Sequence, residues 1–281
     1  MPEGGFLHLK DGLYGAESTA WAAIALEAYG YAGGLLDSAR QRLKSHQLPD
    51  GRVSISPDHP DAYWLTAPAV LAWTRSPGDF EPKTKAVHFL LGTSGRHWPR
   101  DPQAPVAHDT ELRGWPWTAG THSWTEPTAL ALIALKVQGL QIRNHDRVRE
   151  AERMLLDRQL PCGGWNYGNT FVFGQELRAM PDCTGLSLDA LSGAAQESRV
   201  SHSIHYLKNG LQTLRTPRSL AWSLMGLSAW EERPDDAEER IASCLAHRNR
   251  FGASDTASLA LLSLALLAPR GLKSLFQEAV P

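Results

Sequence analysis

The sequence predicts an all-α fold, an (α/α)6 toroid in which a ring of six inner helices is surrounded by six outer helices. Two observations predict it: a Thr-Ala-type segment that recurs along the chain, and charged amphipathic stretches that alternate with this segment. Repeats at intervals of tens of residues are typical of arrays of similar helical units. We expect residues 1–281 to form one domain, because this length suffices for a sizeable core.

The recurring segment begins with Thr and carries Ala six residues later. It is apolar nearly all round, which a helix tolerates only when it is buried on every side. Four copies align without gaps and two weaker copies follow, which together predict six inner helices. The good copies begin at Thr19, Thr66, Thr128 and Thr184, and the weaker ones at Ser219 and Thr256.

The stretches between these repeats are predicted to form the outer helices. Within 146–159, the apolar residues Val148, Ala151, Met154 and Leu155 recur at helical spacing, and charged residues occupy the opposite side. Small residues on the inner helices would let those helices approach closely around the axis. The predicted outer helices span 35–46, 83–91, 146–159, 201–211, 237–247 and 271–279.

Composition excludes several classes of function. A net charge of −2 with 21% charged residues provides no electrostatic footprint for nucleic acid. The first ten residues lack the features of a signal peptide, and the most apolar run, 257–267, is too short to span a bilayer. The three cysteines show no metal-ligand spacing. We therefore expect a cytoplasmic protein, with peripheral membrane contact left open, and no cofactor, bound metal or nucleic-acid partner.

Acidic residues stand two positions before the repeat Thr in three copies: Glu17, Glu126 and Asp182. Parallel inner helices would bring all three to one mouth of the ring. An acid at a helix start also satisfies free N–H groups and complements the helix dipole, an effect of about 0.5–2 kcal/mol for a cap. Capping alone therefore explains Glu17 and Glu126 as readily as a functional role does.

Gln159 followed by Gly163-Gly164-Trp165 forms a Gln-Trp motif, and a weaker copy runs from Gln47 to Gly51 with Val53 in the Trp position. This motif resembles the repeat of the α/α-toroid superfamily of triterpene cyclases and protein prenyltransferases. Within it, the chain is most similar to squalene–hopene and oxidosqualene cyclases, which carry the prenyltransferase and squalene oxidase repeat. The resemblance covers most of the chain at the level of architecture. It implies that Trp165 clamps an outer helix to an inner one.

The segment Met180-Pro-Asp182-Cys183-Thr184 stands where these cyclases carry their proton-donating Asp motif. The resemblance implies that Asp182 protonates an alkene or epoxide and that Cys183 is its hydrogen-bonding neighbour. Burial favours the neutral carboxyl, whereas a helix N-terminus favours the carboxylate, so such an acid can be neutral and still donate readily. Two departures stand out: Met180 replaces the first Asp of the hopene-type motif, and Gly185-Leu186 replaces the Ala-Glu of the oxidosqualene type.

The substrate that this resemblance implies is a small hydrophobic isoprenoid in a cavity along the axis of the ring. Aromatic faces would stabilise cationic intermediates there. The long connection 92–123 is a candidate lid, because loops of that length are more often functional than filler. The candidate binding residues are Glu17, Trp64, His122, Trp124, Glu126, Trp165 and Tyr167.

Three alternatives remain open. One is a catalytically inactive scaffold or lipid-binding toroid. Another is a carbohydrate-active (α/α)6 enzyme that uses Glu126 and Asp182 as acid and base, about 5–9.5 Å apart. Zinc-dependent prenyl transfer is the third, but Asp182 and Cys183 supply only two of the three ligands it needs. A closed aromatic pocket would indicate cyclisation, an open polar cleft sugar chemistry, and a filled axis a scaffold. Substrate length and oligomeric state stay open.

Overall fold

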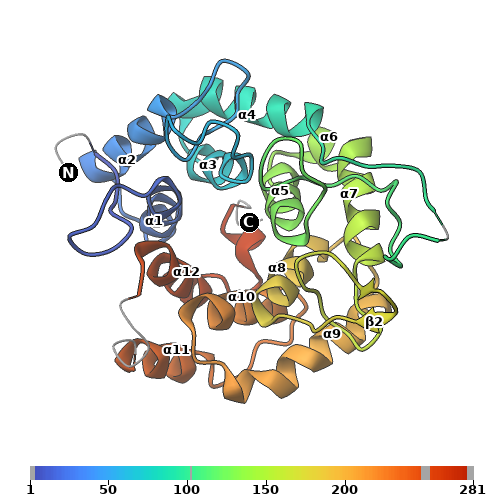
Figure 1. Cartoon of the computed structure of the whole chain (residues 1–281). Helices are drawn as coiled ribbons and strands as arrows, with labels where there is room; N and C mark the ends of the chain where they lie inside the picture. Colours follow the sequence, from blue (N-terminus) through green and yellow to red (C-terminus); the bar gives the residue numbers. More distant parts are fainter. Residues whose placement is uncertain (1–3, 102, 248–253, 277–281) are drawn as a thin grey trace.

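The computed structural model describes residues 4–101, 103–247 and 254–276, and these form a closed double ring of helices (Figure 1). The predicted α/α toroid is confirmed, and each Thr-type repeat lies on an inner helix. Every inner helix packs against the next, and the last packs against the first. The inner helices are α1 (Ala16–Ala28), α3 (Thr66–Trp73), α5 (Thr125–Lys136), α8 (Pro181–Leu191), α10 (Pro217–Ser228) and α12 (Thr256–Leu267).

The outer ring alternates with the inner one along the chain. The apolar stripe predicted for 146–159 is confirmed, because Val148, Ala151, Met154 and Leu155 are all fully buried. The outer helices are α2 (Gly34–Ser45), α4 (Phe80–Gly92), α7 (Asp146–Asp157), α9 (Glu197–Gly210) and α11 (Ala237–Ala246). The shorter elements are η1 (Pro77–Asp79), α6 (Leu140–Arg143), η2 (Leu211–Thr213) and an antiparallel hairpin of β1 (Phe171–Val172) and β2 (Gln175–Glu176). No helix within the described ranges is long and apolar enough to cross a bilayer.

The last predicted outer segment, 271–279, takes a different position. Leu272–Phe276 forms a 3-10 helix, η4, which packs against α5 and α12 near the centre of the ring (Figure 1). Leu272 is fully buried, and its N–H donates to Oδ2 of Asp189 on α8 at 2.6 Å. The amphipathic pattern is therefore real, but its apolar side covers the C-terminal end of the inner helices. Residues 277–279 of the prediction lie outside the described ranges.

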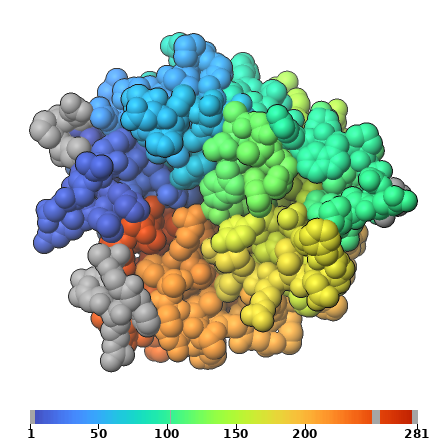
Figure 2. Space-filling model, viewed as in Figure 1, coloured from blue at the N-terminus to red at the C-terminus, as the bar shows by residue number. Residues whose placement is uncertain are grey.

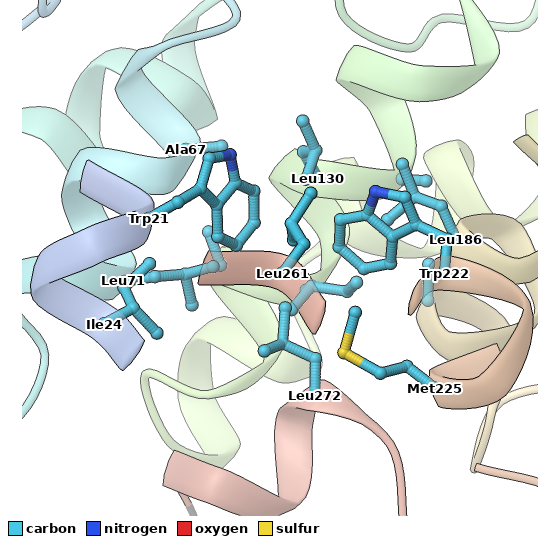
Figure 3. Close-up of a cluster of buried hydrophobic side chains, with 14 of the residues drawn as sticks. Trp21, Ile24, Ala67, Leu71, Leu130, Leu186, Trp222, Met225, Leu261 and Leu272 are labelled. Atoms are coloured by element: carbon cyan, nitrogen blue, oxygen red, sulfur yellow. The ribbon is translucent and has the colours of Figure 1, made fainter. Parts of the chain in front are cut away.

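Side chains fill the axis where the sequence predicts a cavity (Figure 3). Trp21 and Trp222 meet edge to face with their ring centroids 5.7 Å apart, and each is only 1% exposed. Leu130, Leu261 and Leu272 belong to the same cluster. In the view of Figure 1, the space-filling surface shows the centre of the ring covered by atoms (Figure 2). The predicted axial cavity is therefore corrected: small residues bring the inner helices together, and large side chains occupy the remaining space.

The contact between α8 and α10 shows how closely the inner helices approach. A Cβ atom added at Gly185 would overlap the carbonyl oxygen of Trp222, and one added at Gly226 would overlap the backbone of Gly185. Interiors at native packing density have no room for such an atom without backbone movement. This contact accounts for glycine at position 185, where the oxidosqualene-type motif carries alanine.

The repeat Thr has one structural task in all four good copies. Its hydroxyl accepts a hydrogen bond from a backbone N–H of the preceding loop, which therefore runs back across the start of the inner helix. The pairs are Phe6 to Thr19 at 2.9 Å, Val53 to Thr66 at 3.1 Å, Trp115 to Thr128 at 2.9 Å and Trp165 to Thr184 at 2.9 Å.

Two of these loop residues also reach outward to the outer ring. The indole Nε1 of Trp165 donates to the carbonyl oxygen of Leu155 at 2.7 Å, and that of Trp115 donates to Leu90 at 2.9 Å. Both tryptophans follow a glycine and are fully buried. The predicted clamp at Trp165 is thus observed, and Trp115 forms a second clamp that the sequence analysis missed.

Candidate functional site

Four charged side chains meet at the mouth where the inner helices begin; we call them the rim cluster. Glu17 of α1, Glu126 of α5 and Asp182 of α8 lie there, as the parallel arrangement predicts. Arg218 of α10 joins them: its Nη1 is 3.2 Å from Oε1 of Glu17, and its Nη2 pairs with Oε1 of Glu126. The acidic pattern of the repeat does not point to Arg218. Its position does mark it as a helix-start residue, because it directly precedes Ser219, where a weak copy of the repeat begins.

The rim cluster is a partly compensated network of charges. Glu126 is 7% exposed, and burial raises the pKa of its carboxyl. The positive charge of Arg218 opposes this rise, whereas the negative charges of Asp182 and Glu17 add to it. Burial by itself lowers the pKa of Arg218, but the two glutamates outweigh it and raise the pKa, so the guanidinium stays charged.

Asp182 is partly exposed in the first turn of α8. Its Oδ1 accepts the backbone N–H of Cys183 at 3.0 Å. Cys183 itself is 1% exposed, and burial raises the pKa of its thiol, as does the charge of Asp182. Cys183 therefore holds Asp182 through its backbone, and its neutral thiol is no nucleophile.

Aromatic rings stand beside the starts of α3 and α5. Trp64, just before α3, meets Trp117 edge to face with centroids 5.5 Å apart, and both indoles are partly exposed. Tyr167 is 48% exposed, and its carbonyl oxygen accepts the N–H of Thr125 at 2.8 Å, which places it next to α5. Trp165, also predicted to bind substrate, is fully buried in its clamp and offers a ligand no surface.

The glutamines of the Gln-Trp motif connect neighbouring outer helices. Nε2 of Gln159 donates to Oγ of Ser203 on α9 at 2.7 Å, and Nε2 of Gln47 donates to the carbonyl oxygen of Pro82 on α4 at 2.8 Å. The motif therefore stabilises the double ring and contributes no group to the mouth.

The predicted lid, the connection 92–123, is fastened on two sides: to α7, and through Trp117 and Ala119 to the residues just before α3. Arg147 donates from Nη2 to the carbonyl oxygens of Thr93 and Gly114, each at 3.0 Å. Arg158 donates from Nη2 to the carbonyl oxygen of Asp109 at 3.2 Å. Figure 1 shows much of this connection at the outer edge of the ring, beside α7.

His122 is predicted at the rim. The structure instead places it among other residues of the connection 92–123, to which it belongs. Its imidazole lies on Trp124 with ring centroids 4.1 Å apart. Burial and the positive charge of Arg158 lower the pKa of His122. Both His122 and Arg158 line a pocket outside the rim cluster. Among the side chains that the structure describes, no three His, Cys, Asp or Glu are grouped so that they could hold a metal ion.

Neither a family model nor a curated protein matches this sequence. Solved structures do match it. The apo type II terpene cyclase MstE from Scytonema has a TM-score of 0.59 at 17% identity, over 95% of this chain and 92% of that chain. An α-amylase from Clostridium perfringens has a TM-score of 0.58 at 12% identity, over 92% and 87% of the two chains.

A third match has a different extent. The ent-copalyl diphosphate synthase from Streptomyces platensis has a TM-score of 0.58 at 18% identity, covering 92% of this chain, which spans only 50% of the synthase. At such identities the matches show the fold alone. The chain has a terpene cyclase-like α/α toroid fold.

Proposed function

We propose that this protein is a type II terpene cyclase-like protein that binds an isoprenoid chain at the mouth of its ring, and that Asp182 donates the proton that starts cyclisation. One observation carries the proposal: a partly exposed carboxyl, Asp182, stands at the start of an inner helix, and the exposed Tyr167 lies close enough that this charge adds to partial burial in raising the pKa of its phenol. The solved structure of MstE with geranylgeranyl dihydroxybenzoate, at a TM-score of 0.56, supports the choice of ligand class.

Accessibility favours Asp182 over the other acids of the rim cluster. Glu126 is buried and pairs with Arg218, and Glu17 pairs with the same guanidinium. A ligand that enters the mouth therefore meets the carboxyl group of Asp182. One oxygen of this carboxyl accepts a hydrogen bond from the N–H of Cys183. General acid catalysis requires a donor within hydrogen-bond reach of the reacting atom.

The step is an alkene protonation. The carboxyl proton of Asp182 adds to one alkene carbon, the π electrons form the new C–H bond, and the positive charge develops on the other carbon. The α8 N-terminus and the Cys183 N–H stabilise the carboxylate that remains. The faces of Trp64 and Tyr167 would stabilise the carbocation by about 0.5–2 kcal/mol each. Deprotonation of the final cation returns a proton to the enzyme or to water.

A filled axis by itself favours the scaffold alternative. For the cyclase-like function we therefore propose a ligand above the Trp21–Trp222 pair, at the mouth. Squalene and oxidosqualene remain candidate substrates by resemblance, alongside linear prenyl diphosphates. The carbohydrate-active alternative has less support, because Glu126 is tied to Arg218 and does not face Asp182 across an open cleft.

A second candidate function is ligand binding without turnover, as a scaffold or lipid-binding toroid. Two observations favour it: side chains fill the axis, and Arg218 compensates two of the three rim carboxylates. This candidate shares the binding site of the first and differs only in chemistry.

A turnover assay separates the two. The protein is incubated with squalene, oxidosqualene and geranylgeranyl diphosphate, and extracts are analysed by mass spectrometry. We expect a cyclised product with the wild type and with Asp58→Asn, an exposed loop acid that serves as the control, and none with Asp182→Asn. Retained lipid without product would favour the second candidate. Product formed equally by Asp182→Asn would refute the role of Asp182.

A further inference from the structure

A pocket of about 170 Å³ lies outside the rim cluster, between the connection 92–123, the loop that holds Asn169 and the C-terminal end of α7. We call it the loop pocket. Its lining includes none of the rim residues. Two arginines, two histidines and the uncharged polar residues Thr110, Ser123 and Asn169 provide its polar surface, and Trp98, Val106 and Leu112 provide an apolar wall. The loop pocket thus combines cationic and hydrogen-bonding groups with room for a small molecule.

The two arginines have different tasks. Arg158 is 4% exposed and fixed, because its Nη1 donates to the carbonyl oxygen of Gly168 at 2.8 Å and its Nε lies 3.4 Å from Oδ2 of Asp157. Arg96 is exposed, and its guanidinium has no hydrogen bond or ion pair to any other residue that the structure describes. Arg158 therefore builds the wall, and Arg96 is left available to a ligand.

The histidines supply neutral N–H groups at neutral pH. His108 is 8% exposed, and its Nδ1 is buried without a hydrogen-bond partner among the described residues. Burial, with the positive charges of Arg158 and His122 and against the negative charge of Asp109, lowers the pKa of His108 to about 3. An unpaired buried polar atom is unfavourable, so a partner that reaches His108 would be stabilising.

We propose that the loop pocket binds a small organic carboxylate, with Arg96 as its mobile cation and His108 and His122 as hydrogen-bond donors. A single negative charge suits one free guanidinium beside two neutral imidazoles, because each neutral ring offers one N–H. The apolar wall suits a hydrocarbon or aromatic group better than a bare inorganic anion. This site stands independently of any chemistry at the mouth of the ring.

The proposal also predicts how affinity varies with pH. A carboxylate beside an imidazole favours its charged form, but burial, together with the positive charges of Arg158 and His122, holds the pKa of His108 at about 3 against the opposing charge of Asp109. His108 therefore stays a neutral donor in the range of ordinary histidine titration. Affinity is expected to change little between about pH 7.5 and about pH 5.5.

The test titrates the protein with benzoate, inorganic phosphate and the uncharged benzyl alcohol, with histidine side-chain NMR signals as the readout. We expect saturable shifts of His108 and His122 with benzoate alone, and similar affinity at about pH 5.5 and about pH 7.5, because a pKa of about 3 leaves His108 neutral at both. Arg96→Gln, at the exposed edge, should weaken benzoate about tenfold. His97→Gln, an exposed neighbour outside the lining, is the matched control.

Three results would overturn the assignment. Absence of saturable shifts with benzoate would remove the site. Tighter binding of phosphate or of benzyl alcohol than of benzoate would show that the ligand is not a carboxylate. Equal affinity in Arg96→Gln and the wild type would remove the role of the guanidinium. Because Arg96 is exposed, its replacement leaves the packing of the pocket intact, and a failure to fold does not confuse the outcome.

Discussion

At the scale of single residues, the pairing of Arg218 with Glu17 and Glu126 sets the charge at the mouth of the ring. The sequence predicts the acids from the repeat but not their partner, because the α10 copy of the repeat lacks the acid that would draw attention to it. A pairing between residues 92 or 201 positions apart depends on ring closure, which no local pattern contains.

Replacing Arg218 tests this pairing. In Arg218→Gln the buried Glu126 loses its cation, and we expect the free energy of unfolding to fall by about 1–3 kcal/mol near neutral pH. The loss should shrink as the pH falls, because burial raises the pKa of Glu126 and a protonated Glu126 no longer needs a cation. Urea denaturation from neutral to acidic pH measures both effects. Arg215→Gln, an exposed arginine that contacts only nearby carbonyls, is the control, and an equal loss at every pH would contradict the pairing.

His108 predicts a second pH dependence. The folded protein binds a proton on His108 only near pH 3, whereas the unfolded chain binds one near the ordinary value of about 6.5. Its contribution to stability is therefore present above pH 6.5 and is lost towards pH 3, by about 1.4 kcal/mol per pH unit. His108→Gln should show a shallower fall over this window than the wild type or His97→Gln. Parallel stability curves would contradict the shift.

At the scale of elements, the Thr repeat predicts the inner helices because burial on all sides leaves a clear mark in the sequence. The second clamp, Trp115, could have been found from spacing: Phe6, Val53 and Trp115 each precede their partner Thr by 13 residues. Trp165 precedes Thr184 by 19 residues, because its loop also holds the β1–β2 hairpin, and this longer spacing hid the relation.

The close approach of α8 and α10 makes Gly185 a sensitive position. Gly185→Ala forces a methyl group against the α10 backbone, and we expect a loss of about 1–3 kcal/mol of stability from overpacking. Gly210, at the end of α9, has open space where a Cβ would lie. Gly210→Ala should therefore be neutral or stabilising by up to about 1 kcal/mol. Thermal denaturation of the two variants compares their stabilities. Equal effects would show that contact with α10 is not the cause of the loss in Gly185→Ala.

At the scale of the whole molecule, the six inner helices and their alternation with outer helices follow from the sequence, but the content of the axis does not. Whether Trp21 and Trp222 line a cavity or fill it depends on the distance between the inner helices, which is set by many small residues together. The position of η4 is equally a matter of tertiary packing, because one amphipathic pattern fits an outer face or the end of the ring.

The central claim is that the mouth of the ring binds an isoprenoid chain, and native mass spectrometry after incubation with geranylgeranyl diphosphate or squalene tests it most directly. Trp64→Ala removes an indole of the mouth, and Tyr29→Ala removes an exposed aromatic ring at the opposite end of α1 as the control. The account predicts one retained prenyl ligand in the wild type and in Tyr29→Ala, and much weaker retention in Trp64→Ala. No retained ligand in the wild type, or equal retention in all three proteins, would contradict it.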